Sequence, residues 1–314
     1  MKFNVAAKYK LVVRNGADDS IARESDWFPN LITGAGIEWL LTATSYTAFR
    51  AVAGAGNVTP SISDTTLQSY LGACTTKQAD SPSYQATASP YWVRRTITFR
   101  GALGAVVGNV SEVGVAMSGS PTASTTLFSR ALVVDSNGNP TTVPVTSEEY
   151  LDIVWEFTIY LAETQGTFNQ VIDGVTTAFD YTLTALGLGG SSINTGWGFY
   201  NTNYDLIYPM GGSSSDWAHI FESNGLLAVT SLATAGSDVG TVGPNGTYDP
   251  VSYSRPFRVS AGLDIANFAT GIGLLTAAMG TFRFQLAFTG NKVMKTASKI
   301  YSFDFNVAIV NGAP

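Results

Sequence analysis

Apolar and polar residues alternate along two long segments of this chain. In residues 151–161 the odd positions are all apolar, whereas Asp152, Glu156 and Thr158 stand between them. Residues 301–309 repeat the pattern, with Tyr, Phe, Phe, Val and Ile at the odd positions. Because successive side chains of a β-strand point to opposite faces, each pattern predicts a long strand with one buried and one largely solvated face.

Shorter β-rich runs predict further strands at 8–14, 93–99, 110–116, 127–134, 141–145 and 282–288. Asn137-Gly138 and Asp173-Gly174 each lie between such runs. Both dipeptides tolerate the positive φ angles of a tight turn, so we expect a hairpin at each. Short strands at this spacing indicate an antiparallel sandwich.

The best helix candidate is the short run 37–43, which follows Gly34 and Gly36. We expect this helix, of about two turns, to pack across the end of a sheet. From 54 to 89 the composition changes to Ser, Thr, Ala, Gly and Pro. This change predicts a loop excursion that decorates the first half of the chain.

A polar stretch at 162–167 follows the first long strand and predicts a division into domains 1–162 and 163–314. The second domain contains a loop-rich aromatic region, 186–250. Residues 254–275 have the basic, aromatic, Gly-spaced character of 94–116, and each segment is followed by β-rich runs and a long closing strand. A divergent duplication would explain this likeness, although unrelated strands converge on such patterns. The expected fold is mainly β, with two antiparallel β-sandwich-like domains.

The composition limits the classes of partner. Of the residues, 45% are hydrophobic and only 13% are charged, against about 25% charged in average proteins. A neutral surface rich in Ser, Thr, Asn and Gly suits protein contacts or neutral ligands such as glycans. The net charge of −6 argues against nucleic-acid binding, which needs clustered Lys and Arg.

Cys74 is the only cysteine, so an intrachain disulfide is impossible. The N-terminal residues lack the apolar core of a signal peptide, and no apolar run approaches the length that spans a bilayer. We therefore expect synthesis as a soluble cytosolic protein without membrane insertion.

Candidate catalytic residues are few. His219 is the only histidine, which excludes metal sites built on several histidines. A triad through His219 and Asp216 lacks the G-x-S-x-G motif of a nucleophile elbow. Glu148 and Glu149 are adjacent, so on a strand they point to opposite faces rather than toward one substrate. Residues 135–139 favour a hairpin turn over a calcium loop. We expect no catalytic residue, no cofactor and no metal, and a protein that is not an enzyme.

Aromatic side chains in the loop-rich region are the candidate ligand or interface residues. Aromatic residues there form a core or subunit interface, or stack on a ligand, and the first outcome is the more common. The residues are Trp197, Phe199, Tyr200, Tyr204, Tyr208 and Trp217.

Three stretches resemble structural proteins of tailed bacteriophages. They are NLITGAGIEWL at 30–40, NVTPSISDTTL at 57–67, and the run from RRTITFRG through NVSEVGVAM and LFSRAL to EEYLDIVWEF at 94–157. A similar progression occurs in tail-tip, baseplate and fibre-associated proteins, and the likeness covers about 30–161. The resemblance implies a β-rich assembly protein and brings no catalytic residue. Within these motifs, Glu112 would bond the backbone of a bend, and Arg130 would pair with Glu148 or Glu149.

The sequence thus predicts a structural component of a tailed-phage virion, in the tail, baseplate or fibre apparatus. It would be assembled in the host cytoplasm as a symmetric homo-oligomer with other virion proteins. One alternative is a receptor-binding tail protein that recognises a host surface glycan through the aromatic loops. A head-decoration or collar protein is a second alternative, and a polysaccharide depolymerase that uses scattered carboxylates has the least support.

Overall fold

A computed structural model of the chain describes residues 1–44, 47–85, 88–162, 164–172, 175–185, 206–207, 217–222, 237–279 and 282–314. The described residues are mainly β, as the sequence predicts, with a single helix, α1 (Gly34–Thr42). That helix is too short to cross a membrane, and no other described segment forms a membrane-spanning helix.

The main sheet has fourteen strands in the order β15-β16-β22-β21-β18-β19-β20-β23-β1-β14-β9-β8, with β2 and β3 paired to β1. Its strands are β1 (Lys2–Asn15), β2 (Ile21–Glu24), β3 (Phe28–Pro29), β8 (Thr76–Gln85), β9 (Tyr91–Arg100), β14 (Glu149–Leu161), β15 (Gln165–Ile172), β16 (Val175–Ala185), β18 (Trp217–Phe221), β19 (Ser237–Pro244), β20 (Ser254–Ala261), β21 (Leu274–Met279), β22 (Phe282–Phe288) and β23 (Tyr301–Asn311).

A smaller five-stranded sheet has the order β4-β12-β11-β6-β7. Its strands are β4 (Leu31–Ile32), β6 (Arg50–Gly54), β7 (Tyr70–Cys74), β11 (Glu112–Ala116) and β12 (Leu127–Leu132). Short two-stranded sheets are formed by β10 (Gly108–Val110) with β13 (Val143–Val145), and by β5 (Thr47–Ala48) with β17 (Leu206–Ile207).

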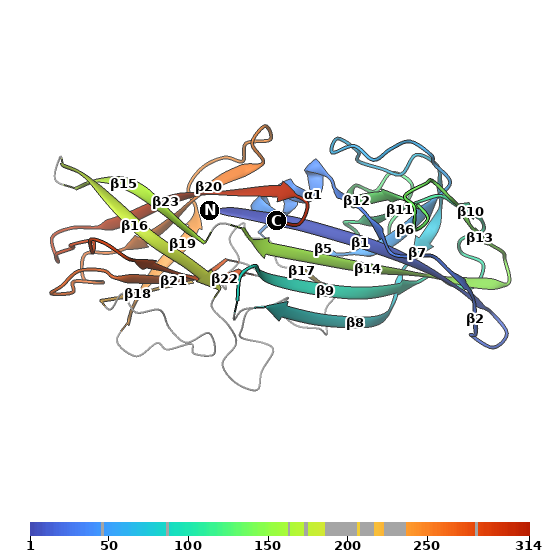
Figure 1. The fold of residues 1–314 in the computed structure, drawn as a ribbon, viewed down its shortest axis with the longest axis horizontal. Helices are drawn as coiled ribbons and strands as arrows, with labels where there is room; N and C mark the ends of the chain where they lie inside the picture. The colour runs from blue at the N-terminus through green and yellow to red at the C-terminus, as the bar shows by residue number, and fades with distance from the viewer. Residues whose placement is uncertain are drawn as a thin grey trace.

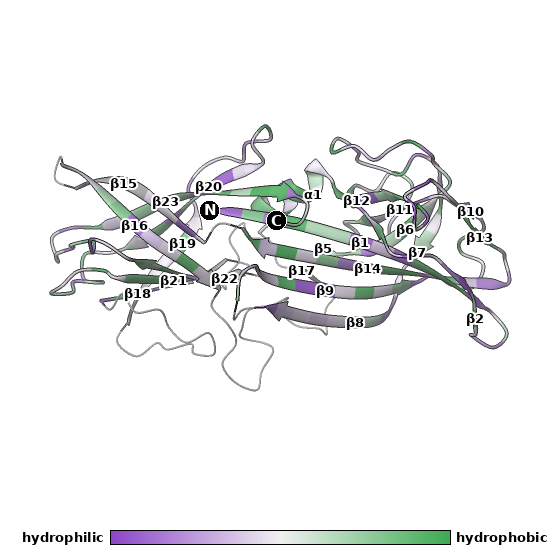
Figure 2. Cartoon of the chain, in the orientation of Figure 1, coloured by the Kyte–Doolittle hydropathy of each residue, from purple (hydrophilic) through white to green (hydrophobic). Residues whose placement is uncertain are grey.

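The small sheet packs on the buried face of β14. All the odd-numbered residues of β14 from 151 to 161 are buried, as the alternation predicts. The ring of Phe128 on β12 lies 5.8 Å from the ring of Trp155 and 5.2 Å from that of Phe157, both in edge-on contact. Figure 2 shows hydrophobic and hydrophilic positions succeeding one another along β9 and β14. The sandwich-like core of this half is therefore built by the pattern that the sequence displays.

Helix α1 covers one side of this core and begins earlier than the sequence predicts. Thr33 caps it, because its hydroxyl oxygen accepts a hydrogen bond from the Gly36 amide at 3.0 Å. A Cβ at Gly36 would lie 2.3 Å from the carbonyl oxygen of Phe128. Glycine at this position lets the helix lie directly against β12, and the cap moves its start to Gly34.

The main sheet is elongated because two of its strands overlap only at their ends. Residues 2–5 of β1 run parallel to residues 308–311 of β23. From this overlap β23 extends in one direction and β1 in the other, and together they would span roughly 70 Å at about 3.3 Å per residue. Figure 1 shows this long axis, with both chain termini near the middle of the molecule. Strands from before and after 162–167 belong to this one sheet, and the division into two domains there stays a prediction.

Corresponding strands pair alike in the two halves. The basic strand β9 pairs antiparallel with the closing strand β14, and β20 pairs antiparallel with the closing strand β23. Among the odd residues 301–309 of β23, all are buried except Phe305, which is partly buried. The shared pairing agrees with a duplication, whose ancestry stays a hypothesis.

Several expectations differ from the structure. The turn at Asn137-Gly138 closes a short hairpin, as predicted: Gly138 has a φ of +82°, Val134 pairs antiparallel with Pro140, and the amide of Thr141 donates to the carbonyl oxygen of Val133 at 3.0 Å. Beyond this hairpin, however, β12 and β13 enter different sheets. The expected loop excursion 54–89 contains strands β7 and β8. The turn at Asp173-Gly174 lies outside the described residues, although Ile172 and Val175 on either side of it do pair.

The second face of β14 is less solvated than predicted. Asp152 and Thr158 on that face are both buried. Asp152 accepts hydrogen bonds from Nε of Arg14 at 2.9 Å and from Nε of Arg100 at 2.7 Å. The two long arginine side chains cover the carboxylate, which alternation alone cannot reveal.

Candidate functional site

The aromatic candidates fall mostly outside the described part of the chain. Trp197, Phe199, Tyr200, Tyr204 and Tyr208 all lie there. Trp217 begins β18, where its backbone pairs with Ala278 of β21. The role of these residues in a core, an interface or a ligand site therefore stays a prediction.

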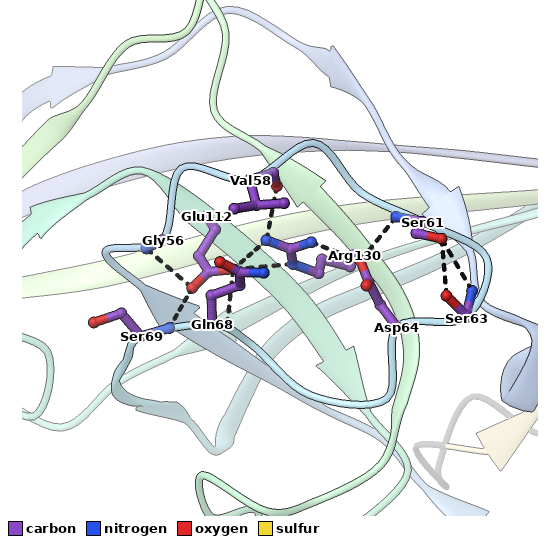
Figure 3. Close-up of polar contacts among 9 residues, drawn as sticks. All are labelled: Gly56, Val58, Ser61, Ser63, Asp64, Gln68, Ser69, Glu112 and Arg130. Atoms are coloured by element: carbon purple, nitrogen blue, oxygen red, sulfur yellow. Dashed lines mark hydrogen bonds and ion pairs between the residues drawn. The ribbon is translucent and has the colours of Figure 1, made fainter.

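A buried ion cluster joins β11, β12 and the loop 55–69 (Figure 3). The side chain of Arg130 on β12 is 1% exposed and that of Glu112 on β11 is 0% exposed. Nε and Nη2 of Arg130 lie 2.9 Å and 2.8 Å from Oε2 of Glu112. Nη1 of Arg130 donates to Oδ2 of Asp64 at 2.6 Å, and Nη2 donates to the carbonyl oxygen of Val58 at 2.9 Å.

Glu112 also holds the backbone of the loop, as expected from its position at a bend. Its Oε1 accepts hydrogen bonds from the amides of Gly56 at 3.0 Å and Ser69 at 2.8 Å. Its Oε2 accepts a further bond from the amide of Gln68 at 3.2 Å. A Cβ at Gly56 would lie 2.3 Å from Oε1, so glycine permits this close approach.

The expected partners of Arg130 are wrong. Arg130 pairs with Glu112 and Asp64, whereas Glu149 accepts a hydrogen bond from Nη2 of Arg23 at 2.6 Å and Glu148 is exposed. The prediction failed because Glu112 on the neighbouring strand β11 supplies one carboxylate, and the loop 55–69 folds back over β11 and β12 and supplies the second, Asp64. The available signal was one charge of each sign inside the apolar strands EVGVA and LFSRAL.

The cluster fastens the loop rather than offering a site for chemistry. Both oxygens of Glu112 are occupied by a guanidinium and three backbone amides. A carboxylate committed in this way is a poor general acid or base, because proton transfer needs an atom within reach of a substrate.

The histidine candidate is only partly described. His219 lies on β18 opposite Thr276, and burial lowers its pKa. Asp216, with which His219 would form a triad, lies outside the described residues. Among the other carboxylates, Asp18 accepts hydrogen bonds from the amide and hydroxyl of Ser20, and these bonds lower its pKa. Across the described ranges, no group of three or more His, Cys, Asp or Glu residues could hold a metal ion.

A shallow cleft of about 350 Å³ lies on the outer face of the main sheet. The outer face is the side of β1, β14 and β9 that carries their even-numbered residues, opposite the core. The cleft is lined by Ala6, Ala7, Lys8, Trp27, Phe28, Pro29, Arg94, Glu156, Thr158 and Tyr160.

Six of the eleven exposed large apolar side chains of the described residues lie toward the two ends of the elongated sheet. At the end where β1 finishes and β2 begins, which we call the β1 end, they are Ile21, Leu103 and Val107. At the opposite end, where β20 finishes and β23 begins, which we call the β23 end, they are Leu263, Met294 and Ile300. The loops of the β23 end are joined by a hydrogen bond of 3.1 Å from Nζ of Lys295 to the carbonyl oxygen of Leu263.

Comparison of the chain with protein-family models, with curated proteins and with solved structures finds no match in any of the three.

Proposed function

We propose that this protein is a structural component of a tailed-phage virion, in the tail, baseplate or fibre apparatus, and that it acts by assembly with copies of itself and with other virion proteins. The sequence motifs at 30–40, 57–67 and 94–157 support the class of protein. A head-decoration or collar protein, the alternative, would also act by assembly through protein–protein contacts.

The apolar groups at opposite ends of the sheet are the observation that carries this proposal. Apolar side chains that stay in water are common singly, whereas contiguous patches of them mark contact surfaces. Ile300 is 67% exposed at the β23 end, and Leu103 is 50% exposed at the β1 end. Because the two groups lie on different ends, a β1 end meeting a β23 end forms a head-to-tail contact, which builds rings or filaments.

The anchored loop 55–69 suits the same function. Arg130, Glu112 and Asp64 hold this surface loop through charged contacts that are largely shielded from water. A loop with a fixed shape loses little conformational freedom when a neighbouring subunit packs against it. The low charge of the chain, 13%, leaves its surface suited to close packing.

Substitution at one end of the sheet tests the assembly mechanism. We expect Ile300→Asp to lower the apparent mass of the protein in analytical ultracentrifugation, because it places a charge in the proposed contact. Val251→Asp is the matched control, since Val251 is 87% exposed but belongs to neither end. Equal masses for the wild-type protein and both variants would contradict contact through the β23 end.

Locating the protein in a particle tests the class directly. Electron microscopy of virions that contain the chain, labelled with antibody fragments against it, should show density on the tail or baseplate. Label on the head or collar would instead assign the protein to that part of the particle. A chain found only in infected-cell extract and absent from purified virions would contradict the proposal.

A further inference from the structure

The shallow cleft on the outer face has a floor of small side chains that is bordered by larger ones. Ala6 of β1 lies opposite Thr158 of β14, which lies opposite Arg94 of β9. Ala6 and Thr158 are small, so this row of the sheet forms a floor. Trp27, which precedes β3, stands at one side of the floor, and Tyr160 lies on the next row of the same face. A cleft of about 350 Å³ lies at the lower end of ligand-site volumes, roughly 300–1,000 Å³.

Trp27 presents an aromatic surface to the cleft. Its side chain is 41% exposed, although tryptophan is among the side chains that gain most from burial. The Nζ atom of Lys8 lies 4.7 Å from the ring centroid, and it also pairs with Glu156 at 3.2 Å. The ammonium group thus fixes the indole beside the cleft while leaving much of its surface open.

Arg94 carries hydrogen-bond donors that the protein leaves available. Its Nε donates to Oγ1 of Thr158 at 3.0 Å and lies 3.2 Å from Oε1 of Glu156, and its guanidinium stacks on Trp92 at 4.5 Å. No described residue accepts a hydrogen bond from its two terminal nitrogens, and the side chain is 30% exposed. Such a positioned guanidinium matches the two oxygens of a carboxylate.

The charges of the cleft favour an anion. Its charged lining residues are Lys8, Arg94 and Glu156, so two cations share one carboxylate and one positive charge is left over. The whole chain, in contrast, carries a net charge of −6. A ligand that fits this site has a flat face of apolar C–H groups that can stack on Trp27, and it carries one negative charge that can pair with Arg94.

We propose that this cleft binds a carboxylated sugar, with the pyranose ring against Trp27 and the carboxylate at the terminal nitrogens of Arg94. The site is separate from the aromatic residues at 197–217, and it does not depend on membership of a virion. An acidic polysaccharide of a cell surface is the class of polymer that would present such a residue.

Titration of the wild-type protein with methyl glycosides of galacturonic acid, glucuronic acid and N-acetylneuraminic acid tests the site, with methyl galactoside as the neutral probe. We expect saturable binding of at least one acidic sugar in ligand-observed NMR, and weaker binding of the neutral one. Arg94→Gln should weaken binding of the acidic sugar about tenfold or more and remove the preference for acidic over neutral sugars. Trp27→Ala should abolish binding of every probe.

Arg258→Gln is the matched control, because Arg258 is an exposed arginine paired with Asp304 away from the cleft, and it should change binding less than about twofold. Circular dichroism of each variant shows whether it is folded. The proposal is overturned if none of the three acidic sugars binds, if methyl galactoside binds equally well, or if Arg94→Gln binds like the wild type. Saturable binding of an oligoglutamate peptide in place of the sugars would also overturn it, and would assign the cleft to an acidic protein partner.

Discussion

Two ion clusters of this protein contain the same kinds of group in opposite surroundings. Around Arg130, a guanidinium and two carboxylates are covered by the loop 55–69. Around Arg94, a guanidinium, an ammonium and one carboxylate lie on the outer face of the main sheet. The Arg130 cluster has more carboxylates than cations, and backbone amides occupy the remaining oxygens of Glu112. The Arg94 cluster has more cations than carboxylates, and the terminal nitrogens of Arg94 remain available as hydrogen-bond donors.

The comparison shows how burial decides what a charged residue can do. A buried charge must have all its hydrogen bonds satisfied inside the protein, so its partners are fixed and removal of one is severe. An exposed pair contributes little to stability, because water competes for both partners. The Arg130 cluster is therefore suited to holding the fold, and the Arg94 cluster is suited to binding.

The largest effect is expected for Arg130→Gln. Loss of the guanidinium leaves Glu112 buried without its counter-ion, which should lower the free energy of unfolding by about 3–5 kcal/mol. Urea denaturation followed by tryptophan fluorescence measures the change. A loss below about 1 kcal/mol would mean that water enters the cluster and that the two clusters do not differ as proposed.

A smaller loss is expected for Asp152→Ala, whose position is intermediate between the clusters. The carboxylate is buried, but its partners Arg14 and Arg100 both reach solvent and can be hydrated again. Removal should lower the free energy of unfolding by about 1–3 kcal/mol in the same urea experiment. A loss as large as that of Arg130→Gln would show that the exposure of the partners does not matter.

Glu149 gives a dependence on pH. Its hydrogen bonds with Arg23 and then Thr146 lower its pKa below the ordinary value of 4.5. A depressed folded-state pKa means that the stabilisation is present above pH 4.5 and is lost as pH falls through the folded-state pKa. The wild-type protein should therefore be more stable than Glu149→Gln at neutral pH, and the free energies of unfolding of the two proteins should converge in acid.

Urea midpoints measured from neutral pH down to the acid limit of the native state test this expectation. The adjacent exposed Glu148→Gln serves as the control and should show no such convergence. A difference between wild type and Glu149→Gln that stays constant with pH would contradict the assignment of Arg23 as the partner.

The smallest effect is expected for Arg94→Gln, the counterpart of Arg130→Gln. Its pair with Glu156 is partly exposed to solvent, with side chains 30% and 14% exposed, so the free energy of unfolding should fall by about 1 kcal/mol or less. The same urea measurement made on both arginine variants gives the contrast in one experiment. A loss similar to that of Arg130→Gln would make Arg94 a structural residue and would remove the reason to treat its cluster as a binding site.

The sequence alone determined the class of fold and those strands that show clear alternation, because alternation along a strand is a local property; β7 and β8, which lack it, were expected to be loop. The sequence pattern predicted the buried odd positions of β14 and β23 and the bounds of β22. It also placed the start of the helix within three residues. Glu112 was correctly expected to bond backbone, since a charge in an apolar strand requires a partner.

Only the tertiary structure decided which distant segments meet. The partners of Arg130, the burial of Asp152, the pairing of β13 with β10, and the cleft between Trp27 and Arg94 all join residues far apart in the chain. Periodicity reports which face of a strand is buried, but it carries no information on what covers that face. That depends on strand order and on how each loop folds back, and these are set by the packing of the whole chain.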